Sequence, residues 1–239
     1  MTNQFNPERH SVAARVLAAL LSYPDASLRA LLPELETALQ RDTVLPAERR
    51  DAVLLLIADL RQSEPLEAEA RYVDTFDRGR RTSLHLFEHV HGDSRDRGPA
   101  MIDLQQTYAQ EGLLLEAGEL PDYLPVVLEF ASTQPYEVAR EFLAEMAHLL
   151  QSIHAALARL HSPYAAVVAA ALDLASEPVQ PPETVPEAPA EGPLDEQWAE
   201  PLVFDGCSAA GQSAAPQVQP IQIVRRDAAS PRRSKDAIV

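Results

Sequence analysis

Apolar residues along the first three quarters of the chain recur at the spacing of an α-helix. In the opening segment, Val12, Val16, Leu17, Leu20 and Leu21 fall three or four positions apart, so they share one helical face. Similar sets recur downstream, while apolar and polar residues nowhere alternate over a stretch long enough to favour a strand. The pattern predicts an all-α protein.

Proline, glycine and capping residues divide this pattern into helices. Asn6 and Pro7 suit an N-cap followed by proline at the first helical position, and Asp25 or Ser27 can cap the next helix. Glycines such as Gly112 close others. The predicted helices cover about 7–23, 27–39, 46–62, 65–79, 82–91, 99–112, 121–132 (interrupted at Pro125), 136–160 and 164–175. We therefore expect a single bundle of about eight to nine helices.

The character of the chain changes at Ser176. Prolines recur after it among Glu, Ala and Val, a composition that can neither sustain a helix nor bury a core. We expect a bundle domain over residues 1–175 and a Pro-rich, acidic, largely disordered tail over 176–239. An apolar island around Trp198 lies inside that tail, and the terminus turns basic. The island either folds back on the bundle or serves as a short interaction motif.

Charge and composition exclude several classes of protein. The formal net charge is −16, which argues against nonspecific nucleic-acid binding, because Lys and Arg must replace counterions on phosphates. It suits a basic partner, although many acidic proteins are simply well solvated. The opening residues lack the apolar core of a secretory signal, and apolar runs such as Val53 to Ala58 fall far short of the ~20 residues that span a bilayer. With one cysteine, Cys207, no internal disulfide can form, and we expect a cytoplasmic protein without direct membrane insertion.

One short motif suggests an enzyme. The run from His85 through Glu88 to His89 matches H-x-x-E-H, an inverted zinc-peptidase pattern. On the helix predicted over 82–91, the two imidazoles would share a face and Glu88 could act as general base. No signature of a third protein ligand follows. A metallohydrolase therefore stays an alternative, against which His89 can equally interact with the carbonyl groups at a helix end.

A dense block of charges among aromatic residues runs from Tyr72 to Asp103. Such density is typical of a solvated helix face. It also fits a polar network beside an apolar groove, which would suit an amphipathic helix from a partner with basic flanks. Its charged members are Asp74, Asp77, Arg78, Arg80, Arg81, Glu88, Asp93, Arg95, Asp96, Arg97 and Asp103.

This block carries a resemblance to a known family. The runs YVDTFDRGR from Tyr72 and TSLHLFEHVHG from Thr82, continued by SRDRG from Ser94 and ELPDYLP from Glu119, closely resemble the NarJ family of nitrate reductase delta chains. The segment LDEQW ending at Trp198 is similar to a C-terminal motif of the same family. Position 85 need not be histidine in the family, which weakens the zinc interpretation.

The resemblance implies the all-α fold of the TorD- and DmsD-like redox-enzyme chaperones. It implies a protein that is no enzyme, holds no cofactor of its own and is not a subunit of the finished reductase. The implied partner is the alpha (catalytic) subunit of nitrate reductase, bound through its N-terminal segment while it receives molybdenum cofactor and before it attaches to the membrane. Molybdenum cofactor delivery proteins are candidate further partners, and a chaperone for another molybdoenzyme is the alternative.

We expect the site for the client peptide to lie within the same block. Apolar side chains would line or support a groove, acidic ones would contact basic flanks of the peptide, and arginines would order the loop from Gly92 to Pro99. The candidate peptide-binding residues are Tyr72, Phe76, Leu84, Phe87, Glu88, His89, Asp93, Asp96, Met101, Asp103, Leu104, Asp122 and Tyr123, and the loop-ordering residues are Arg78, Arg80, Arg95 and Arg97.

Overall fold

The computed structural model describes residues 7–90, 96–116 and 118–186. These residues form nine α-helices and three short 3₁₀ helices, and they contain no β-strand, so the predicted all-α class is confirmed for this part of the chain. The helices are α1 (Pro7–Leu20), α2 (Ala26–Gln40), α3 (Ala47–Gln62), α4 (Pro65–Phe76), α5 (Arg97–Gln110), α6 (Leu124–Thr133), α7 (Tyr136–Glu145), α8 (Ala147–Arg159) and α9 (Ala165–Leu174), with η1 (Arg80–Thr82), η2 (Leu86–Glu88) and η3 (Pro182–Thr184).

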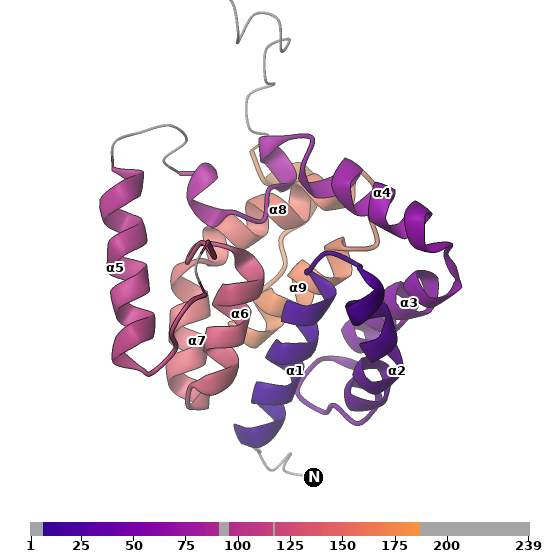
Figure 1. Cartoon of the computed structure of the whole chain (residues 1–239), viewed down its shortest axis with the longest axis horizontal. Helices are drawn as coiled ribbons and strands as arrows, with labels where there is room; N and C mark the ends of the chain where they lie inside the picture. Colours follow the sequence, from indigo (N-terminus) through magenta and orange to yellow (C-terminus); the bar gives the residue numbers. More distant parts are fainter. Residues whose placement is uncertain (1–6, 91–95, 117, 187–239) are drawn as a thin grey trace, which may run out of the picture. The chain divides into compact units, whose positions relative to one another are not determined.

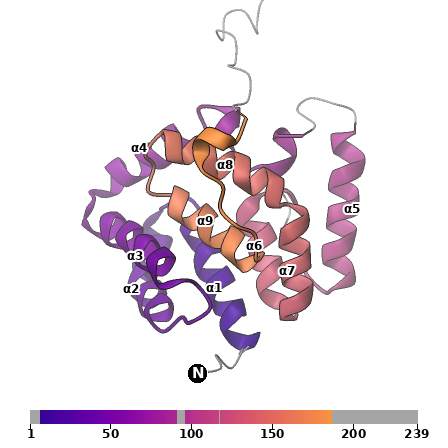
Figure 2. The same ribbon diagram turned by 180° about the vertical axis from the view of Figure 1, so that it is seen from behind.

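Helix α9 forms the centre of the bundle. Its residues are apolar almost all round, and the run from Val167 to Leu172 is fully buried, as expected for a helix surrounded by others. It packs against α1, α3, α7 and α8, while α1 also packs along α6 (Figures 1 and 2). No helix in the described ranges is long and apolar enough to cross a membrane.

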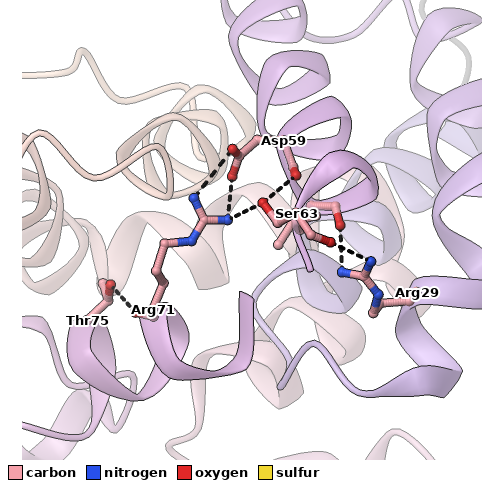
Figure 3. Close-up of polar contacts among 6 residues, drawn as sticks. Arg29, Asp59, Ser63, Arg71 and Thr75 are labelled. Carbon is pink, nitrogen blue, oxygen red and sulfur yellow. Dashed lines mark hydrogen bonds and ion pairs between the residues drawn. The ribbon is translucent and has the colours of Figure 1, made fainter. Parts of the chain in front are cut away.

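Two arginines tie α2, α3 and α4 together where α3 ends (Figure 3). Arg29 of α2 donates to the carbonyl oxygens of Leu60 and Ser63 at 2.6 and 2.8 Å, which satisfies acceptors that the helix end leaves without an intrahelical partner. Arg71 of α4 donates to Asp59 at 2.8 Å and to the Ser63 hydroxyl at 2.7 Å. Asp25 caps α2 as predicted, accepting from the Leu28 amide at 2.8 Å.

The helix predicted over 82–91 is wrong. The backbone at His85 is extended, with φ −86° and ψ 102°, and only Leu86–Glu88 forms a 3₁₀ turn. The segment pairs with the chain before α6: the Leu124 amide donates to the Leu84 carbonyl at 2.8 Å, and the Leu86 amide donates to the Asp122 carbonyl at 3.0 Å. This pairing buries Leu84 and Leu86 on either side of His85, so tertiary contacts override the local helical pattern.

Two other predicted helix boundaries differ from those in the structure. Pro125 does not interrupt a helix from residue 121; it lies in the first turn of α6, where proline is tolerated because its missing N–H has no intrahelical acceptor. The stretch predicted as one helix over 136–160 divides at Met146, whose φ of −95° and ψ of 1° leave the helical range. The division lets α7 pack on α6 while α8 packs on α9.

The chain continues in contact with the bundle beyond the predicted boundary at residue 175. Gln151 of α8 donates to the Pro178 carbonyl at 2.7 Å and accepts from the Gln180 amide at 3.1 Å. Arg159 donates to the carbonyls of Pro182 and Val185, the latter at 2.7 Å. Polar side chains on α8 thus fix a segment whose described residues form no α-helix, only the 3₁₀ turn η3. The expected tail character of 187–239, with Trp198 and Cys207, concerns residues outside the described ranges.

A second, smaller core holds α5 at the edge of the bundle (Figure 1). It consists of Leu104 and Tyr108 from α5 with Val126 and Phe130 from α6. The Tyr108 ring lies 4.6 Å from that of Phe130, and its hydroxyl donates to the Pro121 carbonyl at 2.9 Å. The opposite side of α5 is exposed, so the helix is anchored along one face only.

Candidate functional site

Two adjoining hollows lie beside the end of α4. The larger, of about 530 Å³, is bounded by α4, by Tyr23 after α1 and by the segment before α6. The smaller, of about 380 Å³, extends toward Arg78 and Glu88. Phe76, Asp77, Ser83 and His85 line both. We call the two together the α4 groove.

The floor of the α4 groove is aromatic and held rigidly. The Tyr72 hydroxyl donates to the Leu21 carbonyl at 2.7 Å and lies 3.1 Å from the Tyr123 hydroxyl. The Tyr72 ring contacts those of Phe76 and Tyr23, with centroids 4.8 and 5.5 Å apart. Burial raises the pKa of Tyr72 far above its usual value, so its hydroxyl stays neutral. Rigid aromatic surfaces of this kind suit apolar anchors of a bound peptide.

Asp122 lies directly behind the groove and is fully buried. One carboxylate oxygen accepts from the Phe87 amide at 3.1 Å and lies 3.7 Å from Arg97. The other lies 3.5 Å from His85 Nδ1, an ion-pair separation longer than a normal hydrogen bond. Asp122 therefore fixes the positions of three residues around the groove rather than presenting its charge to a ligand.

Glu88 and His89 are both directed toward Ser83. Glu88 accepts from the Ser83 hydroxyl at 2.6 Å and lies 3.6 Å from Arg97, while His89 Nε2 lies 2.9 Å from the Ser83 carbonyl oxygen. His85 faces Asp122 instead. The helical face on which the zinc hypothesis rested is absent, and the described residues hold no group of three side chains able to bind a metal ion.

The structure brings part of the predicted peptide-binding set together. Tyr72, Phe76, Leu84 and Tyr123 line the larger hollow, and Glu88 lines the smaller. The residues predicted on α5 line neither hollow. Leu104, one of them, belongs to the second core. The other predicted residues that line neither hollow are Phe87, His89, Asp96, Met101, Asp103 and Asp122, while Asp93 and Arg95 lie outside the described ranges.

Among the predicted loop-ordering arginines, Arg97 lies between Glu88 and Asp122 at the start of α5. Arg78 pairs with Asp74 one helical turn earlier, at 3.0 Å, and Arg80 lines the smaller hollow. Arg78 and Arg97 therefore lie beside carboxylates, and the role of these arginines in ordering the loop stays a prediction.

The residues that line the larger hollow also include Tyr23, Asp77, Glu119 and Leu120, none of which was among the predicted peptide-binding residues. Tyr23 is 44% exposed and its hydroxyl donates to Glu69 at 3.1 Å. An aromatic residue directly before Pro24, in a connection between two helices, is the signal that could have identified it, because loops that leave helix ends commonly carry binding residues.

We predict that His85 stabilises the fold in a pH-dependent way. The Asp122 carboxylate raises the pKa of His85, although burial opposes it. The stabilisation should be fully present below the unfolded value of about 6.5 and lost as the pH rises through the higher folded value. Urea unfolding of the wild type and His85→Gln at several pH values measures this. The difference in unfolding free energy should shrink from pH 6 to pH 9; an equal difference throughout would contradict the ion pair.

The fold of this chain is shared with a solved structure. A putative redox enzyme maturation protein from Archaeoglobus fulgidus superposes on this chain with a TM-score of 0.52, covering 74% of this chain and 98% of its own, at 18% identity. The bundle therefore shares the fold of that protein. Residues 23–170 match the model of the nitrate reductase delta subunit family, and the chain belongs to that family.

Named relatives agree with this assignment. The nitrate reductase molybdenum cofactor assembly chaperone NarJ of Escherichia coli K12 is 44% identical over 161 residues, 67% of this chain and 68% of its own. A probable chaperone of the same kind, NarW of the same strain, is 41% identical over 67% of each chain. Probable NarJ of Bacillus subtilis is 32% identical over 67% of this chain and 86% of its own.

Proposed function

We propose that this chain is a cytoplasmic assembly chaperone for nitrate reductase. It binds the N-terminal segment of the alpha (catalytic) subunit, supports insertion of molybdenum cofactor into that subunit and delays its attachment to the membrane. Membership of the nitrate reductase delta subunit family and the names of the relatives support the client. The α4 groove carries the proposal for the mode of binding, because it joins a rigid aromatic floor to an acidic rim.

The shape and charge of the groove favour an amphipathic helix. The buried rings of Tyr72 and Phe76 line its floor, and Tyr23, which is 44% exposed, lies beside them. Asp77 and Glu119 are exposed at its rim, where they can meet basic residues on the flanks of the peptide. A peptide with apolar anchors three or four residues apart and Lys or Arg beside them matches both features.

The proposed role requires binding rather than catalysis. A chaperone that binds only the immature form stabilises it by mass action, and the mature form is released when its N-terminal segment becomes buried in the finished enzyme. The cofactor is cargo of the client in this scheme. The side chains of His85, Glu88 and His89 are used to hold the chain beside the groove, which fits a protein that performs no chemistry itself.

Charge reversal at the rim tests the binding mode. We expect Asp77→Lys combined with Glu119→Lys to weaken binding of a synthetic N-terminal peptide of the alpha subunit by about tenfold at low salt, since two attractive contacts become repulsive. Isothermal titration calorimetry measures the affinity. Both side chains are exposed, so thermal unfolding should stay close to that of the wild type.

Glu145→Lys provides the matched control, because Glu145 is an exposed carboxylate on α7 that lines neither hollow. It should bind the peptide like the wild type. An equal loss of affinity in the control and the double variant would show that the net charge of the protein, rather than the rim of the groove, is responsible. Unchanged affinity in the double variant would move the binding site away from the α4 groove.

A further inference from the structure

A third hollow, of about 910 Å³, lies beside the α4 groove, between the end of α4 with η1 and helix α8. Arg78, Gly79 and Arg80 line both this hollow and the smaller part of the groove, so one short segment of the chain separates the two. We call the third hollow the α8 hollow, and the segment from Arg78 to Arg80 the ridge.

The ridge carries no side chain at Gly79. A Cβ atom added at this position would meet nothing within 4 Å, so the space beside the backbone is open. The backbone there is extended, with φ −166° and ψ 148°, and no backbone hydrogen bond among the described residues involves Gly79. An extended peptide therefore has room to cross the ridge at Gly79 and can pair with its N–H and C=O groups, as added strands do at the edge of a sheet.

The arginines around the α8 hollow are already engaged within the chain. Arg78 pairs with Asp74 at 3.0 Å, and Arg159 donates to two backbone carbonyls of the segment after α9. Arg80 and Arg81 also have partners. These side chains frame the hollow, so a ligand would be recognised by the apolar part of its wall rather than by the arginines.

The apolar part of the wall comes from both sides of the α8 hollow. Leu149, Ala156 and Leu160 belong to α8 and its C-terminal end, and Val90 lies opposite. Leu160 is 62% exposed and Val90 is 53% exposed. An apolar side chain inserted between them would remove apolar surface from water on both partners, which is favourable. The hollow thus offers a place for one apolar anchor next to the α4 groove.

We propose that the client peptide extends beyond the α4 groove. After its helical part, it crosses the ridge at Gly79 in extended form and places an apolar side chain against Val90 and Leu160. This inference rests on the proposed function, because it concerns the same peptide. The bound segment starts at the N-terminus of the alpha subunit, so the part that crosses lies on its C-terminal side. An extended chain advances about 3.3 Å per residue, so about four residues cross a ridge one backbone wide.

Synthetic peptides of different length test the extension. One covers about the first 18 residues of the alpha subunit, enough for about five helical turns, and another is about ten residues longer. Isothermal titration calorimetry with the full chain measures both affinities. We expect the longer peptide to bind about tenfold more tightly, the factor that burial of one apolar side chain typically supplies. A third peptide, whose added residues are all Gly and Ser, should bind like the short one.

Variants in the wall of the α8 hollow locate the added contact. Val90→Ser combined with Leu160→Ser should abolish the advantage of the longer peptide and leave the affinity of the short one unchanged, because neither residue lines the α4 groove. Leu55→Ser combined with Val138→Ser is the matched control, since both residues are exposed, on α3 and α7, and line none of the three hollows. The control should keep the full advantage, and thermal unfolding should show that both double variants are folded.

Substitutions of Gly79 test the crossing point. Gly79→Trp fills the open space at the ridge and should bring the ratio of the two affinities close to one, whereas Gly79→Ala adds a methyl group to extended backbone and should keep the ratio. The ratio is the readout because Gly79 also lines the groove, so either affinity alone can change. A photoreactive group near the C-terminal end of the longer peptide should crosslink to residues of α8.

The outcomes distinguish this inference from the proposed function. Equal affinities of the short and the longer peptide for the wild type would overturn the extension and leave binding in the groove standing. An equal advantage for the Gly and Ser peptide, an advantage retained by the Val90 and Leu160 double variant, or crosslinks only outside α8 would overturn it as well. No binding of any of the peptides would overturn the binding mode in the α4 groove and the extension with it.

Discussion

Replacing Asp122 by alanine is expected to lower the free energy of unfolding by about 3 kcal/mol, because it leaves buried partners of a fully buried carboxylate without their acceptor. The Phe87 amide loses its hydrogen bond, and Arg97 and His85 lose an ion pair. Arg97 is partly exposed, so water offsets part of its loss. Urea unfolding measures the change.

Two comparisons isolate the cause. Asp122→Asn keeps an acceptor for the Phe87 amide but removes the charge, so its cost should be intermediate and the pKa of His85 should fall toward its ordinary value. Asp103→Ala removes an exposed carboxylate from α5 and should change stability by less than about 0.5 kcal/mol. A cost for Asp122→Ala as small as that of Asp103→Ala would show that the buried carboxylate does not hold the groove together.

Replacing Tyr108 by alanine should cost about 3–5 kcal/mol, the range for removing a buried aromatic side chain. The ring fills the second core against Phe130 and Phe142, and its hydroxyl bonds to the Pro121 carbonyl. Because α5 is anchored along one face only, the loss should appear first as detachment of that helix. Hydrogen exchange measured by mass spectrometry should therefore accelerate over residues 97–110 well before it does in α9.

Tyr108→Phe and Ile102→Ala are the matched controls. The first keeps the ring and removes one hydrogen bond, and the second truncates an exposed apolar side chain on the other face of α5. Neither should detach the helix. Uniform acceleration of exchange across the whole bundle in Tyr108→Ala would show instead that α5 and the main core unfold as one cooperative unit.

Most helices could be predicted from the sequence because their starts carry strong local signals. Pro7, Asp25 and Pro65 each stand at or beside a helix start in the structure. The segment around His85 could not be predicted in this way. Its conformation follows from hydrogen bonds with Asp122 and Leu124, which lie almost forty residues further on, and periodicity within one segment contains no information about such a partner.

The sequence predicted which stretch of the chain contains the candidate site, but only some of the residues that line it. The family resemblance pointed to the block around Tyr72 and Phe76, and both lie in the floor of the α4 groove. Which acidic residues reach the rim depends on burial. Asp122 is enclosed by its partners, whereas Asp77 and Glu119 are exposed beside the groove, and the sequence alone does not distinguish a carboxylate used inside the fold from one presented to a ligand.

The segment from Arg78 to Arg80 has a consequence for how the protein could be controlled. It is a single short stretch of backbone with the α4 groove on one side and, on the other, a second hollow of about 910 Å³ that is lined in part by α8. Two ligands that contact opposite sides of one segment are thermodynamically linked through any shift it makes, and the linkage is reciprocal: each changes the affinity of the other by the same factor. A molecule bound in the second hollow would therefore change the affinity of the α4 groove for its own ligand.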